Sequence, residues 1–500
     1  MRATNYLDNY YARLGVSRTA SLDEIQQAYR NAARRFHPDA NKQTGAHELF
    51  LLVQEAYQTL SNADQRLEYD SSLPPDIDAP PSIMVNALYS RSQVTPGESG
   101  QLIYVLLDLM PAGVGDLAAH PPLNVCLVLD TSTSMAGTRL EQVAMAASHF
   151  VQQLRREDLL SIVSFNDQAE VVVPAQSMQE AARFQSRIGS IQTRGGTEIL
   201  TGLQLGLREV QRNFRSSFIN HLVLITDGRT YGDEDACLKL AQDASEQGIP
   251  ISAVGIGEEW NEDFMDKLVA KGGGTSLYAD HSAEIHSLLE RRLDTISQVF
   301  AKDVRMFFEP ANQSRLTYAF RLSPDLGALI PASSLHLGAI PIETSLRVLL
   351  EFELDTTSLE AGELILAEGD LRMDIASLAI PSTKARYRLS RFVQELTEVE
   401  TPSQTLVNAI ARLAMYRMQE QARRDIEKGD LAAAAKRMRM LATHLLSAGQ
   451  KGLAKTVLLA ADEIKEGSAL GEKSGKQIKY GTRALINESQ KAINRKRGRQ

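Results

Sequence analysis

Cysteine is scarce and long apolar runs are missing, and both absences exclude classes of protein. The 500 residues include two cysteines, Cys126 and Cys237, which fit neither a CxxC spacing nor a Cys/His zinc spacing. No apolar stretch approaches the roughly 20 residues that a membrane-spanning helix needs. The chain also does not open with a charged start followed by an apolar run. We therefore expect reduced core cysteines and a cytoplasmic protein without a membrane segment.

An excess of positive charge is also missing. The formal net charge is -8 at pH 7, so the whole chain exerts no attraction on nucleic acid or on an anionic membrane. We expect neither as a partner. A chain of 500 residues exceeds what one hydrophobic core supports, so about three or four domains are expected.

Residues 21–36, SLDEIQQAYRNAARRF, predict an amphipathic helix. Ser21 and Glu24 match a capping box at its start, and Pro38 ends it because proline disfavours helix in the residue before it. A second helix is predicted by an apolar stripe that consists of Leu49, Val53, Ala56 and Leu60. We expect the two helices to pack as an antiparallel hairpin with the tripeptide HPD at its tip.

These residues resemble the J domain of DnaJ-type co-chaperones over roughly residues 6 to 72. The segments that carry the resemblance are YYARLGVS, AYRNAARRFHPD and FLLVQEAYQTLSNADQRLEYD. The resemblance implies that a basic helix face docks on an acidic surface of a DnaK-type chaperone and that HPD stimulates ATP hydrolysis by that chaperone. The implied chaperone-binding residues are Tyr29, Arg30, Arg34, Arg35, His37, Pro38 and Asp39. The alternative is a loop histidine beside a solvated basic helix face.

Larger members of that family carry a Gly/Phe-rich linker and a cysteine-containing zinc domain, and this sequence has neither. Residues 73–82, LPPDIDAPPS, instead predict an extended proline-rich spacer between two independently folding units. We therefore expect another module to supply the client or the cellular address.

Short apolar runs alternate with helical stretches between residues 123 and 298. LNVCLVLD, LLSIVSF, INHLVLIT and IPISAVGIG are rich in Val, Ile and Leu, which is typical of strands buried on both faces. Helices are expected at 140–155, 198–212, 234–247 and 282–298. Right-handed crossovers then give a largely parallel, doubly wound α/β sheet, in which ligands bind at the carboxyl ends of the strands.

Three polar segments are expected to meet at that edge: DTSTS (130–134), RGGTE (194–198) and TDGR (226–229). Their oxygen ligands, without thiol or imidazole, favour Mg²⁺ or Mn²⁺ over Zn²⁺. Gly195 and Gly196 would allow a tight turn beside the ion. The candidate metal ligands are Asp130, Ser132, Ser134, Thr197 and Asp227.

This set resembles the metal-ion-dependent adhesion site of von Willebrand factor A domains, with a match over residues 123–298. The resemblance implies that Ser132 and Ser134 bind the ion directly, that Thr197 binds in one conformational state, and that Asp130 and Asp227 act through water. One position of the ion is then left for an acidic group of a partner protein. The alternative is that Asp130 and the serines only cap the following helix.

A catalytic use of these residues is less well matched. A phosphatase of the haloacid-dehalogenase type needs a second aspartate two positions after its nucleophile, where this chain has Ser132. A serine hydrolase needs a histidine, and none of the nine histidines falls in the three segments. We expect no enzymatic activity, with a Mg²⁺-dependent hydrolase as a minor alternative.

Strand patterns flank the central segment on both sides, and we expect one antiparallel β-sandwich into which the A domain is inserted. On SLRVLLEFEL, the apolar side chains alternate with Arg347, Glu351 and Glu353, which should point away from the core.

Beyond residue 402, Ala, Leu, Met, Arg and Lys predict helical hairpins. The expected divisions are a J domain (1–72), linker (73–82), first sandwich part (83–122), A domain (123–298), second sandwich part (299–395), helical bundle (402–485) and basic tail (486–500).

These patterns together predict a cytoplasmic, bacterial co-chaperone adaptor. Its J domain would recruit a DnaK-type ATPase, and its metal site would bind a protein partner. The alternative is a metal-dependent scaffold or regulatory subunit of an ATPase assembly, in which the J domain is secondary.

Overall fold

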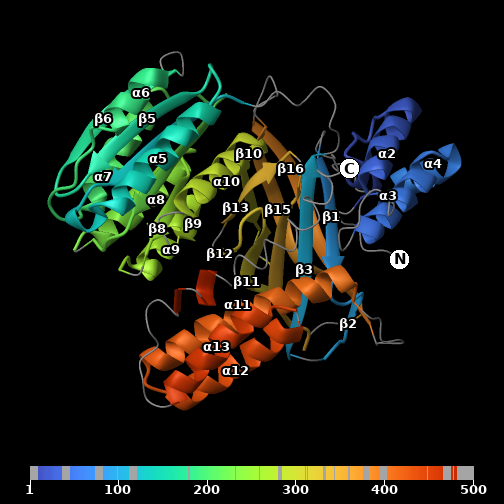
Figure 1. Cartoon of the computed structure of the whole chain (residues 1–500). Coiled ribbons are helices and arrows are strands. Elements are labelled where there is room, and N and C mark those ends of the chain that lie inside the picture. The colour runs from blue at the N-terminus through green and yellow to red at the C-terminus, as the bar shows by residue number, and fades with distance from the viewer. Residues whose placement is uncertain are drawn as a thin grey trace. The chain divides into compact units, whose positions relative to one another are not determined.

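The structure is a computed structural model, and it groups the chain into two compact units. The first contains residues 1–120, 298–412 and 487–500, and the second contains residues 121–297 and 413–486. Figure 1 shows the chain with most of the helices and strands labelled. The described residues are 9–36, 46–73, 83–97, 99–111, 121–177, 181–230, 232–257, 259–279, 284–309, 311, 313–329, 334–342, 344–357, 361–375, 382–394, 402–447, 449–465, 475–476 and 478–480.

The first unit begins with four helices, α1 (Tyr10–Leu14), α2 (Leu22–Phe36), α3 (Ala46–Leu60) and α4 (Ala63–Ser72). The predicted capping box is present, because Glu24 Oε2 accepts a hydrogen bond from the Ser21 N–H at 2.7 Å. α2 and α3 pack against each other through their apolar stripes. The buried side chains of these stripes are Ile25, Ala32, Phe36, Val53, Ala56 and Leu60. The helical N-terminal fold is therefore confirmed, whereas HPD lies outside the described residues.

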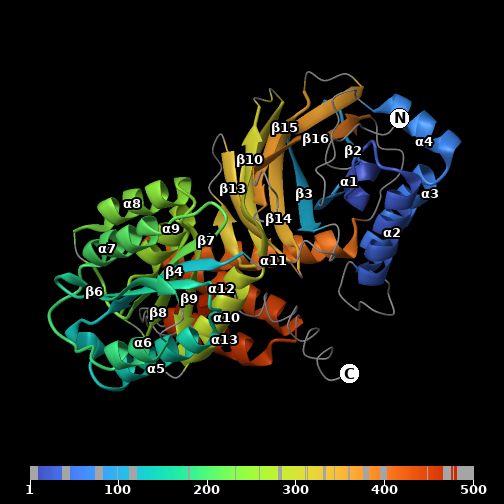
Figure 2. The same ribbon diagram turned by 90° about the horizontal axis from the view of Figure 1, so that it is seen from above.

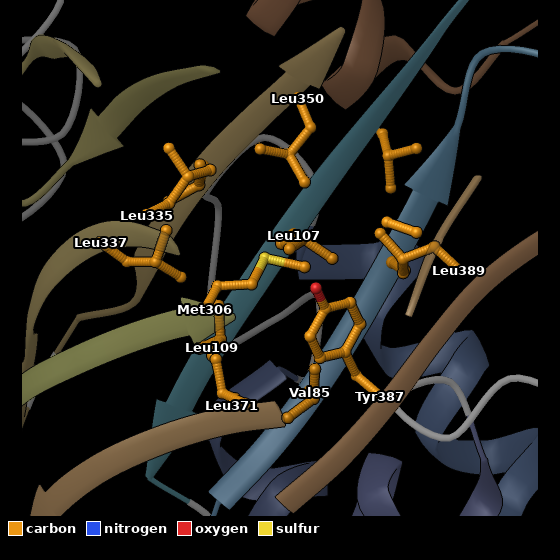
Figure 3. Packing of buried hydrophobic residues seen from close by; sticks show 14 of the residues in the cluster. Val85, Leu107, Leu109, Met306, Leu335, Leu337, Leu350, Leu371, Tyr387 and Leu389 are labelled. Carbon is orange, nitrogen blue, oxygen red and sulfur yellow. The ribbon is translucent and has the colours of Figure 1, made fainter. Parts of the chain in front are cut away.

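The β-sandwich of the first unit uses strands from both sides of the central segment. One sheet has the order β1 (Ile83–Tyr89), β3 (Ser99–Pro111), β14 (Leu346–Asp355), β11 (Ser314–Ser323), β12 (Gly327–Leu329). The other has the order β13 (Ser334–Pro341), β10 (Val299–Phe308), β15 (Gly362–Ile375), β16 (Ser382–Val393), β2 (Gln93–Val94). Their facing side chains, such as Leu107, Leu350 and Met306, form one buried cluster (Figure 3). Since neither flank supplies a complete sheet, the insertion of the central segment is confirmed.

Three features of the sandwich differ from the expectation. β2 pairs in parallel with β16, although the described strands otherwise pair antiparallel in this sandwich. Glu351 lies on the face of β14 opposite the core, as expected, but it is buried there. Met84 and Met110, from β1 and β3, belong to the same buried cluster as Tyr11 and Leu14. The N-terminal helices therefore share core contacts with the sandwich, contrary to the expectation of independent folding.

The second unit contains a sheet with the order β6 (Ala169–Ser177), β5 (Leu159–Phe165), β4 (Leu123–Asp130), β7 (Ile219–Thr226), β8 (Ile251–Ile256), β9 (Gly273–Ala279). All pairings are parallel except that of β6, an edge strand that was not predicted. One face carries α5 (Thr138–Gln153), α6 (Ala181–Ile188) and α10 (Ile285–Ser297) (Figure 2). The other carries α7 (Ile199–Arg212), α8 (Glu234–Glu246) and α9 (Glu262–Lys271). The doubly wound sheet is confirmed.

The order of strands explains where a site can form. From β4 the chain crosses through α5 to β5 on one side, and β7 lies on the other side of β4 after α7. Neighbouring crossovers therefore leave β4 in opposite directions. Such a point opens a crevice at the carboxyl ends of the strands. β4 ends there at Asp130, and β7 ends there at Thr226.

Three helices, α11 (Gln404–Glu427), α12 (Leu431–Ser447) and α13 (Lys451–Lys465), follow the sandwich. Their apolar faces form one buried cluster, so the stripes predicted from the sequence pack within this region. From residue 413 onward these helices belong to the same compact unit as the α/β sheet, and Tyr480 lies in the core of that sheet. None of the described helices combines the length and apolarity required to cross a bilayer.

Candidate functional site

Backbone hydrogen bonds hold two of the three polar segments together at the end of β4. The Arg194 N–H donates to the carbonyl of Thr131 at 2.8 Å, and the Thr133 N–H donates to the carbonyl of Gly195 at 3.2 Å. The short 3₁₀ helix η1 (Thr133–Met135) turns the chain here before α5 begins. The segments around Asp130 and Thr197 are thus fixed side by side, as the sequence predicts.

Asp130 is a buried carboxyl group with two internal donors. Its Oδ1 accepts from the Ser132 N–H at 2.8 Å, and its Oδ2 accepts from the Thr226 hydroxyl at 2.5 Å. Burial raises the pKa of Asp130 from 3.8 to about 6, while these hydrogen bonds act in the opposite direction. The charge of Asp227 adds to the rise. A nearby cation would therefore stabilise the charged form of the Asp130 carboxyl group.

A chain of hydroxyl contacts joins the first segment to the third. The Ser132 and Ser134 hydroxyl oxygens are 2.9 Å apart, and the Ser134 hydroxyl donates to Asp227 Oδ1 at 2.7 Å. Asp227 has a fully buried side chain. The oxygens of three candidate ligands are therefore within direct hydrogen-bond contact, although 93 residues separate Ser134 from Asp227.

Thr197 reaches the same place because the residue after Asp227 is glycine. A Cβ atom at Gly228 would lie 2.8 Å from Thr197 Oγ1, so any larger residue would push the threonine away. Gly195 has a left-handed φ of 70°, and the next residue, Gly196, donates its N–H to the Asp167 carboxylate. Asp167 thus holds the turn of this loop. The sequence analysis missed Asp167, which has no motif around it.

Arg139 is the second residue that the sequence analysis missed. It lies in the first turn of α5, and its Nη1 donates to Asp227 Oδ2 at 2.5 Å and to the Ser134 carbonyl at 3.2 Å. The positive charge of Arg139 therefore neutralises a carboxylate that the resemblance assigns to metal binding.

The donor set fits a hard divalent cation. Carboxylate and hydroxyl oxygens from Asp130, Ser132, Ser134, Thr197 and Asp227 converge without sulfur or imidazole, as Mg²⁺ and Mn²⁺ prefer. Within the described residues, no group of three or more His, Cys, Asp or Glu side chains could hold a metal. A metal at this edge would therefore depend on the serine and threonine hydroxyls.

The candidate chaperone-binding residues are only partly within the described chain. Arg30 and Arg34 are exposed on α2, together with Gln27, so these positions form a solvent-facing stripe. Tyr29 is half-buried and stacks on Tyr57 with ring centroids 4.1 Å apart. His37, Pro38 and Asp39 lie outside the described residues, as does the side chain of Arg35.

Comparisons with known proteins identify three segments of the chain. A DnaJ domain model matches residues 9–70, and a von Willebrand factor type A domain model matches residues 124–291. A third model, the Sll0103-like C-terminal α-helical domain, matches residues 404–488.

Individual relatives agree with these matches. The chain is 29% identical over 328 residues to "Uncharacterized protein sll0103" of Synechocystis sp., covering 63% of this chain and 76% of the relative. It is 56% identical over 61 residues to "Chaperone protein DnaJ" of Streptococcus agalactiae, but covers only 16% of that protein.

Solved structures show the same fold. "von Willebrand factor type A from Catenulispora acidiphila" superposes with a TM-score of 0.66 at 17% identity, covering 81% of this chain and 96% of the other. The ArnB paralog VWA2 from Sulfolobus acidocaldarius gives a TM-score of 0.51 at 13% identity, covering 81% of this chain and 99% of the other. The chain therefore carries a DnaJ domain and a von Willebrand factor type A domain, followed by an Sll0103-like C-terminal α-helical domain.

Proposed function

We propose that this protein is a non-enzymatic co-chaperone adaptor. Its DnaJ domain recruits a DnaK-type chaperone and stimulates the ATPase of that chaperone, and its A domain binds a protein partner in a magnesium-dependent way. The observation that carries the proposal is the presence, in one chain, of a DnaJ domain and of three converging loops with hard oxygen ligands.

The exposed face of α2 supports the proposed recruitment of a DnaK-type chaperone. Arg30 and Arg34 lie one turn apart on this face and are both solvent-exposed, so they can approach an acidic partner surface. Exposed charges of this kind steer association more than they contribute to final affinity. His37, Pro38 and Asp39 then act on the bound chaperone, and ATP is hydrolysed in the partner.

The geometry of the three loops supports the proposed magnesium-dependent binding of a protein partner. Ser132 and Ser134 would bind the ion through their hydroxyl oxygens, Thr197 would join them in one state, and Asp130 and Asp227 would act through water. A bound Mg²⁺ would supply a Lewis-acidic position for a carboxylate oxygen of the partner protein. The chain contributes the rigid placement of these oxygens at the ends of β4 and β7.

The hydrogen bonds of the serines argue against a nucleophilic role. The Ser134 hydroxyl donates to Asp227, whose other carboxylate oxygen is paired with Arg139. The carboxylate that accepts from Ser134 is thus already engaged by a guanidinium, and no histidine lies in the three segments to serve as a base. We therefore assign the serines to binding rather than to catalysis.

ATP hydrolysis by a DnaK-type chaperone, measured with and without the full-length protein, tests the proposed recruitment of that chaperone. We expect stimulation by the wild type and its loss in His37→Gln. His444→Gln is the matched control, since His444 is exposed on α12 far along the chain, and it should stimulate as the wild type does. Equal stimulation by the two variants would refute the role of HPD.

A metal-dependent scaffold within an ATPase assembly, in which the DnaJ domain is secondary, is the second candidate. This candidate predicts a partner that is retained in a pull-down by His37→Gln but lost in Asp130→Ala. Loss of the partner in both His37→Gln and Asp130→Ala would instead support the co-chaperone adaptor.

A further inference from the structure

The guanidinium of Arg139 pairs with Asp227, a carboxylate that the resemblance assigns to metal binding. Its Nη1 lies 2.5 Å from Asp227 Oδ2, while the other oxygen of this carboxylate accepts from Ser134. We propose that Arg139 is an internal competitor of the divalent metal, which holds Asp227 neutralised until the ion displaces the guanidinium, and thereby sets the metal concentration at which the site loads. This inference rests on the proposed metal-dependent function.

The competition follows from the burial of the two partners. Asp227 is fully buried, whereas the Arg139 side chain is 37% exposed. A buried carboxylate requires a positive partner at all times, since an unpaired charge in the interior is strongly destabilising. Arg139, in contrast, can turn toward solvent at small cost, because an exposed guanidinium is well hydrated. The ion can therefore replace the guanidinium without leaving Asp227 unpaired.

Arg139 also holds the loop segment that the ion must use. The same Nη1 that contacts Asp227 donates to the Ser134 carbonyl at 3.2 Å. The guanidinium thus bridges the first and third segments. Two cations near one carboxylate repel each other, so the presence of either weakens the binding of the other.

The guanidinium of Arg139 lies next to the turn that follows β8. Gly257 follows β8 with a left-handed φ of 70°, and a Cβ atom there would lie 3.6 Å from Arg139 Nη2. The guanidinium therefore lies against the backbone of this turn. A defined resting place of this kind distinguishes Arg139 from an arginine that merely extends into solvent.

Isothermal titration of the full-length protein with MgCl₂, repeated with MnCl₂, tests the proposal. Arg139→Gln removes the competing charge, and we expect its dissociation constant for metal to be roughly tenfold lower than that of the wild type. Arg139→Lys keeps a positive charge without the planar fork and is expected to fall between them. The matched control is Arg208→Gln, since Arg208 is an exposed arginine on α7 outside the three loop segments. This control should bind metal as the wild type does.

The possible results distinguish the competitor role of Arg139 from the proposed metal binding by the site. Equal or weaker metal binding by Arg139→Gln, with normal binding by the wild type, overturns the competitor role but leaves the metal site intact. No binding by the wild type or by either Arg139 variant overturns both. Thermal unfolding in EDTA adds a second readout. We expect Arg139→Gln to unfold at a lower temperature than the wild type without metal and to gain more from added Mg²⁺, because Asp227 then lacks its only identified positive partner among the described residues.

Discussion

At the scale of single residues, Asp130 is a carboxyl group in an environment that disfavours its charged form. Asp130 is fully buried, and this burial raises its pKa from 3.8 to about 6. The folded pKa is thus above the unfolded one. The contribution of Asp130 to stability is therefore fully present below about pH 4 and is lost as the pH rises through about 6. At neutral pH the metal-free protein is less stable because of this group.

Asp130→Asn should consequently stabilise the metal-free protein at pH 7. The rise in pKa to about 6 corresponds to an increase in the free energy of unfolding of the variant over the wild type on the order of 1–3 kcal/mol. Denaturant unfolding in EDTA measures it at pH 7 and again at pH 4, where the advantage of the variant should disappear. The same variant should gain less from Mg²⁺ than the wild type. A variant that is less stable than the wild type at pH 7 would show that the hydrogen bonds to Thr226 and Ser132 outweigh the burial of charge.

Residues of the site differ in how far their roles can be predicted. Asp130, Ser132 and Asp227 follow directly from polar residues at the ends of apolar runs, because parallel strands bring their carboxyl ends to one edge. Arg139 could not be assigned in this way. Its partner lies 88 residues away, and the pairing depends on the direction of a long side chain, which no local pattern specifies.

At the scale of elements, the first turn of α9 connects the A domain to the C-terminal region. Glu262 and Asp263 lie in this turn, where negative charge is favourable for the helix dipole. The Lys479 ammonium lies 2.9 Å from Asp266 and 3.6 Å from each of the other two carboxylates. Arg423 of α11 pairs with Asp263 as well. This network attaches the C-terminal segment to the α/β sheet.

Lys479→Met should therefore destabilise the unit that contains the A domain. The lysine is almost fully buried, but its carboxylate partners are partly exposed and can rehydrate, so we expect a loss of about 1–3 kcal/mol. Chemical denaturation followed by Trp260 fluorescence measures the change, since this tryptophan lies beside Lys476 and Tyr480. Lys455→Met is the control, because Lys455 is exposed on α13. Equal stability of the two variants would argue against the network.

The elements also divide into those that could be predicted and those that could not. The strands β4, β5, β7 and β8 are short, apolar and bounded by polar turns, so their pattern is unambiguous. β2 and β12 are two and three residues long, too short for any periodicity. The packing of Tyr480 into the core of the sheet depends on contacts far along the chain, and its local sequence gives no sign of it.

At the scale of the whole molecule, the chain joins a DnaJ domain and a von Willebrand factor type A domain. Linking two modules raises the effective concentration of one partner near the other without any new contact. A partner bound at the A domain would thus be presented to a chaperone recruited by the DnaJ domain. The order of modules could be predicted from motifs alone. The core shared by Tyr11, Leu14, Met84 and Met110 could not, because it forms between segments on either side of the proline-rich stretch.

A divalent metal site formed by the three loops underlies both the proposed function and the inference about Arg139. Anomalous diffraction from crystals of the full-length protein grown with MnCl₂ locates the ion directly, since Mn²⁺ takes the oxygen ligands that Mg²⁺ takes. We predict one strong peak at the carboxyl ends of β4 and β7, at about 2.1–2.2 Å from the Ser132 and Ser134 hydroxyl oxygens, with Arg139 turned away from Asp227. A peak elsewhere, or no peak while the Arg139–Asp227 pair stays in place, would show that the three loops do not form a metal site.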